Sequence, residues 1–344
     1  MTRVGIIGAS GYTGAELLRV LAKHPTANLT VITSRQYAGR PVGDCWPGLA
    51  HLPYEFMANE DEALYKKADL FFTALPHKAA MDAAAACLER GKKVVDLSAD
   101  FRLSDKAVYE EHYGPHGYPE LLSEAVYGLA EVNAERIKKA RLIANPGCYP
   151  TCSLLPLLPL VKNGLVNPDT VIIDAKSGVS GAGRGATETT HHCEADESVK
   201  AYKVASHRHT PEIEEQLGVV AGRPVRVVFT PHLMPMKRGM LATIYCDPLA
   251  GADRKSVEEA WRSAYAGSVF VGLAHGETLP DTAHVTGTNR CVMAARQDKR
   301  TGKLILLSAI DNLAKGASTQ AVQNMNLMCG YPEAKGLALE PVFP

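Results

Sequence analysis

Cys148 is the residue whose type and setting point most directly to chemistry. It lies in the run NPGCYPT at Asn145–Thr151, directly after the apolar stretch Leu142–Ala144. Asn-Pro-Gly predicts a sharp turn, because proline fixes φ and glycine adopts backbone angles closed to other residues. Since the apolar run Leu154–Val161 then predicts a helix, the thiol would meet helix N-terminal amides, which favour a nucleophilic thiolate. A buried structural cysteine is the alternative, and the local pattern does not decide between the two.

The run HRHTPEI at His207–Ile213 holds the best candidates for the acid/base group that a thiolate nucleophile needs. His207 and His209 could each act as the base, and Glu212 could orient it. The spacing leaves the choice between the two histidines open. An ordinary structural or surface role for both is the alternative.

A glycine-rich loop, GASGYTG at Gly8–Gly14, follows a strand-like run and opens a helix near the N-terminus. Its glycines permit a tight turn, close approach of the backbone to a pyrophosphate, and close packing of helix on strand. The spacing is GxxGxxG, where GxGxxG is commoner. The loop predicts a dinucleotide site formed by Gly8, Ser10, Gly11, Tyr12, Thr13 and Gly14.

The type of dinucleotide is indicated at the end of the second expected strand. NAD-binding enzymes usually carry an Asp or Glu there, to bind the ribose 2′-hydroxyl. The chain reads Thr33-Ser34-Arg35 instead. Ser34 and Arg35 could bind a 2′-phosphate through a hydroxyl and a guanidinium, so NADP(H) is favoured over NAD.

Three further polar segments allow weaker interpretations. Lys176 and the run SGVSGAGR at Ser177–Arg184 offer many amides and two cations that could hold an anionic substrate, with a flexible surface loop as the alternative. The charges of PHLMPMKRG at Pro231–Gly239 are interpreted as solvated. His191–Cys193 suggests a metal, but adjacent ligands rarely reach one ion and no second ligand pair has zinc-site spacing, so no metal site is predicted.

Composition excludes several classes of protein. The 344 residues suffice for two domains, and 37 basic residues balance 37 acidic ones, so neither a nucleic-acid nor a membrane partner is indicated. No apolar run approaches the roughly 20 residues that span a bilayer. The eight cysteines are scattered without a CxxC pair, which argues against a disulfide framework. Because Met1 leads at once into a strand-like run, no signal peptide is expected and the protein is predicted to be cytoplasmic.

Two alternatives to an enzyme with a catalytic thiolate remain to be weighed. A redox-sensing thiol protein would need a resolving partner for Cys148, and Cys152 lies four residues further on. We expect Cys148 to precede the helix, which makes that pairing unfavourable. A non-catalytic NADP-binding regulator is the other alternative, and the presence of both Cys148 and the HRHTPEI run argues against it.

Strands and helices alternate up to about residue 148, which predicts an α/β, Rossmann-type domain with a parallel sheet. Beyond it, successive strands predict an α+β domain with a mostly antiparallel sheet. The expected domains are 1–148, for the dinucleotide, and 149–312, for catalysis, substrate and oligomerisation; a C-terminal helix within 313–330 should pack back on the first. The clearest expected helices are 14–22, 79–90, 256–265 and 315–328. The clearest expected strands are 3–7, 29–33, 70–75, 94–97, 171–175, 225–230, 240–246, 290–296 and 303–309.

Taken together, these motifs resemble the N-acetyl-γ-glutamyl-phosphate reductases of the wider aspartate-semialdehyde dehydrogenase-like family. The resemblance covers essentially the whole chain. It rests on GASGYTG, NPGCYPT, SGVSGAGR, HRHTPEI, PHLMPMKRG and the run DNLAKGASTQAVQNMN at Asp311–Asn326. It implies NADPH-dependent reduction of an acyl phosphate to a semialdehyde, a step of arginine biosynthesis, in a homodimer or homotetramer.

The resemblance also implies roles for individual residues. Cys148 would be the nucleophile and His207 the acid/base group, which takes the hydroxyl proton as a thiohemiacetal collapses, with His209 and Glu212 as supports. Ser177, Gly178 and Asn312 would join the cofactor site. The substrate would be bound by Asn145, Arg102, Arg184 and Arg208. The sequence does not show which of the arginines would bind its carboxylate and which its phosphate. Reductases of aspartyl phosphate or an aminoadipyl phosphate are the competing reading, because the same chemistry would serve them.

Overall fold

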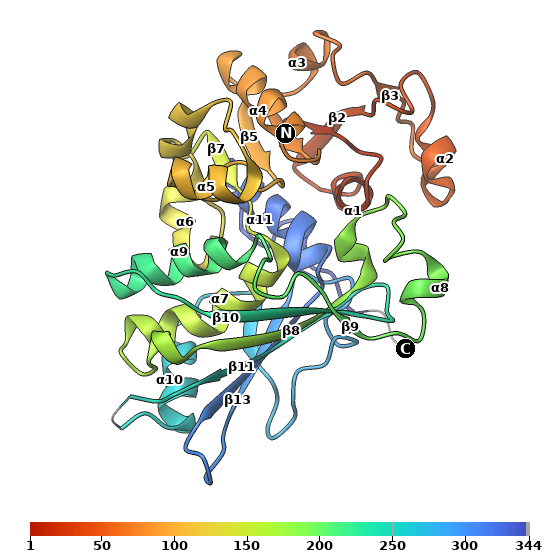
Figure 1. The fold of residues 1–344 in the computed structure, drawn as a ribbon. Coiled ribbons are helices and arrows are strands. Elements are labelled where there is room, and N and C mark those ends of the chain that lie inside the picture. Colours follow the sequence, from red (N-terminus) through yellow and green to blue (C-terminus); the bar gives the residue numbers. More distant parts are fainter. Residues whose placement is uncertain (250, 342–344) are drawn as a thin grey trace. The chain divides into compact units, whose positions relative to one another are not determined.

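The structure is a computed structural model, and it describes residues 1–249 and 251–341. The chain divides into two compact units (Figure 1). The first comprises Met1–Pro146 and Ala317–Ala338, and the second comprises Gly147–Gly316 and the residues from Leu339 onward. The chain therefore crosses from the first unit to the second immediately before Cys148.

The first unit contains a seven-stranded sheet in the order β3-β2-β1-β4-β5-β7-β6, and every pairing in it is parallel. Its strands are β1 (Thr2–Ile7), β2 (Ala27–Thr33), β3 (Phe56–Met57), β4 (Leu70–Thr73), β5 (Lys93–Asp96), β6 (Val126–Tyr127) and β7 (Leu142–Ala144). Strand order reverses between β1 and β4, so loops at their carboxyl ends flank the position where doubly wound sheets bind ligands. The predicted Rossmann-type sheet is confirmed.

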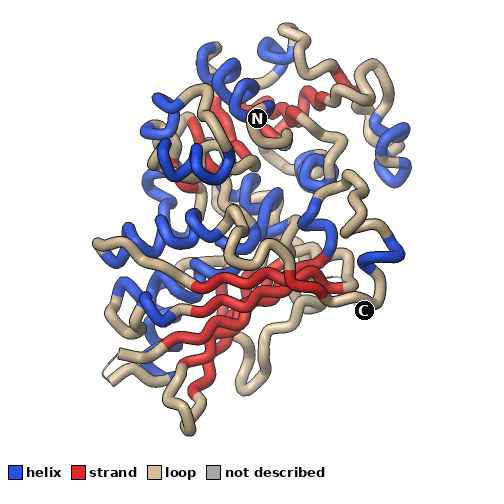
Figure 2. Tube along the Cα trace, viewed as in Figure 1, coloured by secondary structure: helices blue, strands red, loops and turns tan. Residues whose placement is uncertain are grey.

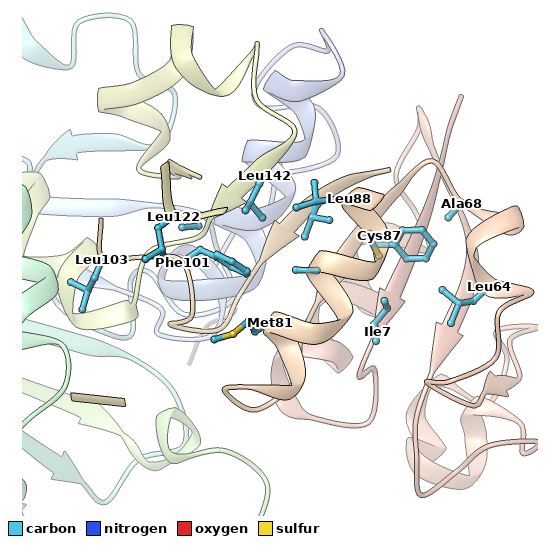
Figure 3. Packing of buried hydrophobic residues seen from close by; sticks show 14 of the residues in the cluster. Ile7, Leu64, Ala68, Met81, Cys87, Leu88, Phe101, Leu103, Leu122 and Leu142 are labelled. Atoms are coloured by element: carbon cyan, nitrogen blue, oxygen red, sulfur yellow. The ribbon is translucent and has the colours of Figure 1, made fainter. Parts of the chain in front are cut away.

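Helices cover this sheet and enclose an apolar core. They are α1 (Tyr12–Leu21), α2 (Val42–Cys45), η1 (Pro47–Leu49), α3 (Leu64–Lys67), α4 (Ala79–Glu89), α5 (Lys106–Tyr113), η2 (Pro119–Ser123), α6 (Ala130–Ile137) and α11 (Thr319–Met328). Figure 3 shows part of the core, in which Met81, Cys87 and Leu88 of α4 pack with Ile7 and Leu142 of the sheet. This burial holds the strand ends, and therefore the loops that follow them, in fixed positions.

α11 is the last helix of the first unit and is buried along its whole length. It packs on α1, α6 and β5. Several of its buried residues are polar, and their partners lie far away in the chain: Asn324 donates to the Gly128 carbonyl, and Gln323 to Glu131. A buried polar helix is tolerated because such hydrogen bonds replace those lost to water.

The second unit contains a seven-stranded sheet in the order β12-β13-β14-β11-β8-β10-β9, drawn in red in the lower half of Figure 2. Its strands are β8 (Ile172–Gly178), β9 (Lys200–Ala201), β10 (Val228–Met234), β11 (Met240–Cys246), β12 (Val271–Leu273), β13 (Cys291–Gln297) and β14 (Leu304–Ile310). Only β8–β10 and β12–β13 pair in parallel, and the other neighbours are antiparallel. The predicted, mostly antiparallel second sheet is confirmed.

One face of this sheet is covered by α7 (Cys148–Lys162), which packs on β11, β14, α9 (Thr210–Ala221) and α10 (Arg254–Ala264). Pro159 lies inside α7 and cannot donate to the Leu155 carbonyl four residues earlier. The Tyr265 hydroxyl donates to that carbonyl instead, at 2.6 Å. The remaining short elements of this unit are η3 (Pro168–Thr170), η4 (Val179–Ala182) and α8 (His192–Ala195). The π-helix η5 (Ala314–Ser318) begins in this unit, and its last two residues belong to the first.

Two element boundaries differ from the predicted ones in ways that affect the site. Cys148 is the first residue of α7 and does not precede the helix, because Gly147 already serves as the extended N-cap. The predicted continuous helix 315–328 is instead the π-helix η5 followed by α11. No helix in residues 1–249 and 251–341 is both long and apolar enough to cross a membrane.

Candidate active site

Cys148 occupies the first helical position of α7 and keeps part of its surface accessible. The N-cap Gly147 donates its N–H to Oε1 of Glu212 at 2.9 Å, and its carbonyl accepts from the Thr151 N–H at 2.9 Å. Glu212 is buried in the first turn of α9. The buried carboxylate therefore fixes the direction in which the chain enters α7, and it holds the thiol at the N-terminus of this helix. The backbone amides of a first helical turn have no acceptor within the helix, so they are available to the thiol.

Gly316, in η5, lies directly against Cys148. A Cβ placed on Gly316 would lie 2.7 Å from Cβ and 3.2 Å from Cα of Cys148, closer than carbon atoms pack. Only glycine permits this approach. π-Helices are uncommon and often occur at functional sites, which agrees with this position.

His207 lies within a group of aromatic rings on the second unit. Its ring centroid is 5.5 Å from that of Tyr149, 5.4 Å from Tyr202, 5.3 Å from Phe229 and 4.9 Å from His209, all in edge-to-face geometry. The structure therefore brings both predicted histidines to the residue that follows Cys148.

The hydroxyl groups of this aromatic group form a short chain of hydrogen bonds. The Tyr202 hydroxyl donates to the Tyr149 hydroxyl at 3.1 Å, and Tyr149 donates to the His232 carbonyl at 3.3 Å. Burial is the main cause that raises the pKa of Tyr202, and the negative charge of Cys148 raises it further. The tyrosines therefore stay neutral and act as hydrogen-bond donors beside the thiol.

The electrostatics around His207 disfavour its charged form. Burial, and then the positive charges of Lys203 and Arg208, lower the pKa of His207 to about 4. The imidazole is consequently neutral at physiological pH. The same two cations make this part of the site suited to an anionic substrate.

Asp311 is a buried carboxylate that joins three segments of the second unit. It pairs with Arg238 (Nε–Oδ2 2.9 Å) and accepts the N–H groups of Gly287, Leu313 and Ala314. The charge of Arg238, interpreted as solvated from the sequence, is therefore held by a fully buried aspartate. Because Leu313 and Ala314 lead into η5, this ion pair fixes the start of the segment that contacts Cys148.

The predicted cofactor residues Ser177, Gly178 and Asn312 meet next to this ion pair. Asn312 accepts the Gly239 N–H at 2.9 Å and donates to the Ser180 hydroxyl at 3.0 Å. A Cβ on Gly178 would lie 2.8 Å from the backbone of Lys237. The side-chain amide of Asn312 thus joins two loops, and Ser177 is buried. Contact of Ser177, Gly178 and Asn312 with a cofactor stays a prediction.

The predicted substrate residues differ in how far their polar groups are occupied. Both ends of the Asn145 amide are used, since it donates to the Ala317 carbonyl and accepts from Asn324. Arg102 donates Nε to the Asn145 carbonyl at 2.7 Å and Nη2 to the Leu97 carbonyl at 2.9 Å. These two residues hold the turn before Cys148 in place.

The remaining predicted substrate cations lie on the second unit. Arg208 is half-buried and close enough to His207 to lower its pKa, whereas Arg184 is exposed on the segment after β8. Lys176 pairs with Asp174 at 2.6 Å, so one of the two cations of the glycine-rich segment is already neutralised. Arg208 is the arginine that the structure brings nearest to the histidine pair.

The glycine-rich loop of the first unit fits a dinucleotide. Gly8 has a φ of +94°, and a Cβ there would lie 2.6 Å from the Ala74 carbonyl oxygen; one on Gly14 would lie 2.5 Å from Cα of Ala9. Gly11 is the N-cap of α1, and its missing Cβ would meet nothing within 4 Å. Gly8 and Gly14 are thus needed for close packing, while Gly11 leaves the N-terminus of α1 open to a phosphate.

The other residues of the predicted cofactor site surround this loop. Ser10 accepts a hydrogen bond from Ser34 at 3.0 Å, and the Thr13 carbonyl accepts one from Ser318. Tyr12 packs against the Trp46 ring. Arg35 is exposed and makes no hydrogen bond or ion pair with any residue that the structure describes, so its guanidinium is available to a ligand.

Four residues at the site were not selected from the sequence: Gly316, Asp311, Tyr202 and Lys203. Gly316 lies in the DNLAKGAS run, which belongs to the motifs of the family resemblance but suggested no catalytic residue. The contact of Asp311 with Arg238 spans 73 residues and has no local signature. His191–Cys193 is exposed, and no group of three metal-ligating side chains occurs among the residues described.

The dinucleotide loop on the parallel sheet, and the cysteine and histidines on the mixed sheet, agree with the class of protein that two family models give, the semialdehyde dehydrogenases. Residues 3–140 match the model of the semialdehyde dehydrogenase NAD binding domain, and residues 148–312 match that of the semialdehyde dehydrogenase dimerisation domain. Aspartate semialdehyde dehydrogenase II of Vibrio cholerae, in complex with ASA, shares the fold with a TM-score of 0.73 at 18% identity, over 96% of this chain and 98% of that one.

Close relatives narrow the class to one family. The N-acetyl-gamma-glutamyl-phosphate reductases of Syntrophobacter fumaroxidans and Geobacter metallireducens are each 52% identical to this chain, over 100% of both sequences. The chain belongs to the N-acetyl-γ-glutamyl-phosphate reductase family. The predicted family and the predicted enzyme class, an NADP-dependent oxidoreductase, are thereby confirmed.

Proposed function

We propose that this chain reduces N-acetyl-γ-glutamyl phosphate to N-acetylglutamate 5-semialdehyde with NADPH, through a thioester on Cys148, as a step of arginine biosynthesis. The single observation that carries the thioester is the position of Cys148 at the N-terminus of α7, against Gly316 and directly before Tyr149, whose ring packs on His207. The relatives of that name, which match over the full length, support the choice of substrate.

The chemistry proposed for Cys148 follows from its setting. The thiolate attacks the acyl carbonyl, the carbon–oxygen bond to phosphate breaks, and a thioester remains. A thioester is a better hydride acceptor than a carboxylate, because sulfur donates little electron density to the carbonyl. NADPH, when bound, supplies the hydride. Collapse of the resulting thiohemiacetal breaks the carbon–sulfur bond, releases the aldehyde and restores the thiolate.

Cofactor binding is assigned to the first unit. The amides at Gly8–Gly14 and the open N-terminus of α1 would hold the pyrophosphate. Ser34 and Arg35, which follow β2, would hold the 2′-phosphate. The free guanidinium of Arg35 supports this assignment.

Substrate binding is assigned to the cations near His207. Arg208, together with Lys203, would attract the phosphate or carboxylate of the substrate. Arg184 would serve as a second cation, whereas Arg102 would act mainly on the turn that contains Asn145.

We also infer a homodimer or homotetramer in the cytoplasm. The face of the second sheet opposite α7 carries exposed apolar side chains, such as Ile172 and Val228, which are 42% and 59% exposed. The match to a dimerisation domain supports the use of this unit in self-association. Light scattering would distinguish the two oligomers.

The experiment that tests this function compares Cys148→Ser with the wild type in phosphate-dependent reduction of NADP, using three semialdehydes. The wild type should prefer N-acetylglutamate semialdehyde over the aspartate and N-acetyl-aminoadipate analogues. Cys148→Ser should lose turnover and still bind NADPH, which fluorescence titration measures. Turnover retained by the serine variant would end the thioester scheme, and preference for another semialdehyde would change the substrate.

A further inference from the structure

Trp46 makes a hydrogen bond to the backbone of the glycine-rich loop in the first unit. Its indole Nε1–H donates to the Ala9 carbonyl at 3.2 Å, and its ring centroid lies 6.3 Å from that of Tyr12, the first residue of α1. Ala9 is fully buried, and no other residue in 1–249 or 251–341 donates to its carbonyl. Without the indole N–H, this buried carbonyl would therefore lose its hydrogen-bond partner, which is costly.

The strand β2 holds the same part of the loop from its other side. The Ala9 N–H donates to the Thr33 carbonyl at 2.9 Å, and the Gly8 N–H donates to the Thr33 hydroxyl at 3.2 Å. Both polar groups of Ala9 thus have a fixed partner, one on β2 and one on Trp46. Because the Ala9–Ser10 peptide is planar and trans, the direction of the Ala9 carbonyl also sets the opposite direction of the Ser10 N–H.

The segment that carries Trp46 is itself well anchored. Trp46 lies between α2 and η1, and its N–H donates to the carbonyl of Val42 at 2.9 Å. Val42 is fully buried, and its own N–H donates to the Tyr54 carbonyl at 2.8 Å. A Cβ on Gly43 would lie 2.8 Å from Cβ of Ala50, so α2 is in close contact with the end of η1. The indole therefore projects from a packed and hydrogen-bonded segment.

We propose that Trp46 is a positioning residue for the cofactor: its indole N–H holds the Ala9 carbonyl, and thereby keeps the loop Gly8–Gly14 in the shape that receives the pyrophosphate before the cofactor arrives. The proposal rests on the dinucleotide site proposed above. A loop that is already ordered binds more tightly, because less conformational entropy is lost on binding.

The proposed role distinguishes Trp46 from Arg35. Trp46 acts on the loop for the pyrophosphate, which NADPH and NADH share, so its loss should weaken the binding of both cofactors by the same factor. Arg35 is assigned to the 2′-phosphate, which NADPH alone carries, so its loss should affect NADPH alone.

Trp46→Phe tests this role, because phenylalanine keeps a ring against Tyr12 and lacks the N–H. The matched control is Trp261→Phe, since the only other tryptophan of the chain is fully buried in the second unit and donates to the Pro156 carbonyl at 2.8 Å. Fluorescence titration with NADPH and with NADH gives the dissociation constants. We expect Trp46→Phe to raise both by about fivefold to tenfold, the factor that one hydrogen bond typically contributes. Trp261→Phe should lower the melting temperature and leave both dissociation constants unchanged.

Hydrogen exchange of the cofactor-free protein gives a second readout, which needs neither binding nor turnover. The peptide that covers Gly8–Gly14 should exchange about fivefold to tenfold faster in Trp46→Phe than in the wild type, and at the wild-type rate in Trp261→Phe. Peptides of the second sheet, measured in the same sample, show whether Trp46→Phe is folded.

Three results would overturn the proposal. They are dissociation constants of Trp46→Phe within about twofold of the wild type, a loss for only one of the two cofactors, and unchanged exchange of the loop. A wild type that binds neither NADPH nor NADH would refute the dinucleotide site itself, and this role with it. The exchange measurement on the cofactor-free protein distinguishes that failure from a failure of Trp46 to hold the loop.

Discussion

Gly316→Ala adds a single methyl group where η5 meets the nucleophile. That methyl would lie 2.7 Å from Cβ of Cys148, whereas carbon atoms pack at about 3.5–4.0 Å. The overlap is therefore about 1 Å, and it falls on a Cβ and on backbone, which cannot rotate away. Either Cys148 or the π-helix must move by a comparable distance. A displacement of about 1 Å at a reacting atom can cost about 100-fold in rate, equivalent to about 2.7 kcal/mol.

The assay is kcat/KM for the semialdehyde in the NADP-reducing direction, with the reaction rate of Cys148 toward iodoacetamide as a second readout. Gly267→Ala is the matched control, because its Cβ would meet nothing within 4 Å. We expect a loss of about 100-fold for Gly316→Ala, none for Gly267→Ala, and folded protein by circular dichroism in both. If Gly316→Ala turned over within about twofold of the wild type, the tight contact with Cys148 would not position the nucleophile.

Two further predictions concern the first unit. Burial, and then Asp100, raise the pKa of Asp96 to about 6. The folded state therefore favours the protonated carboxyl of Asp96. The stability that this form contributes is fully present below the pKa of Asp96 in the unfolded chain, and it is lost as the pH rises through the folded-state pKa of about 6. In urea unfolding, the free energy of unfolding of Asp96→Asn, relative to that of the wild type, should rise by up to about 3 kcal/mol between pH 4 and pH 7. A difference that does not change with pH would contradict this. Arg35→Asp should raise KM for NADPH about tenfold or more and change KM for NADH little, because only NADPH carries the 2′-phosphate; equal changes would reject the assignment.

The sequence predicted the regular elements well where a local pattern defines them. The strand Met240–Cys246 was predicted with its observed bounds, because Gly239 before it and Asp247-Pro248 after it delimit an apolar run. β10 runs to Met234, beyond the predicted end at residue 230, because Pro231 lies inside it. The prediction of a helix over 315–328 could not distinguish η5 from α11, because Asp311 and Gly316 contact Gly287 and Cys148, which lie far away in the chain.

The site was predictable to the extent that its chemistry lies in short motifs. Cys148, His207 and Glu212 come from two such motifs, and the fold brings them together through the Gly147–Glu212 hydrogen bond. The Arg238–Asp311 ion pair could not be foreseen, since neither residue marks the other across the chain. Asn145 was expected to bind the substrate because of the family resemblance, and in the structure its amide is occupied by Asn324 and the Ala317 carbonyl.

The central claim is that Cys148 carries the acyl group, and one measurement tests it most directly. The enzyme would be mixed with N-acetylglutamate semialdehyde and NADP in the absence of phosphate, then quenched in acid and analysed by peptide mass spectrometry. We predict a burst of NADPH stoichiometric with subunits, and an acyl adduct on the Cys148 peptide that hydroxylamine removes. NADPH formation that requires phosphate from the first turnover, with no adduct on Cys148, would contradict the account.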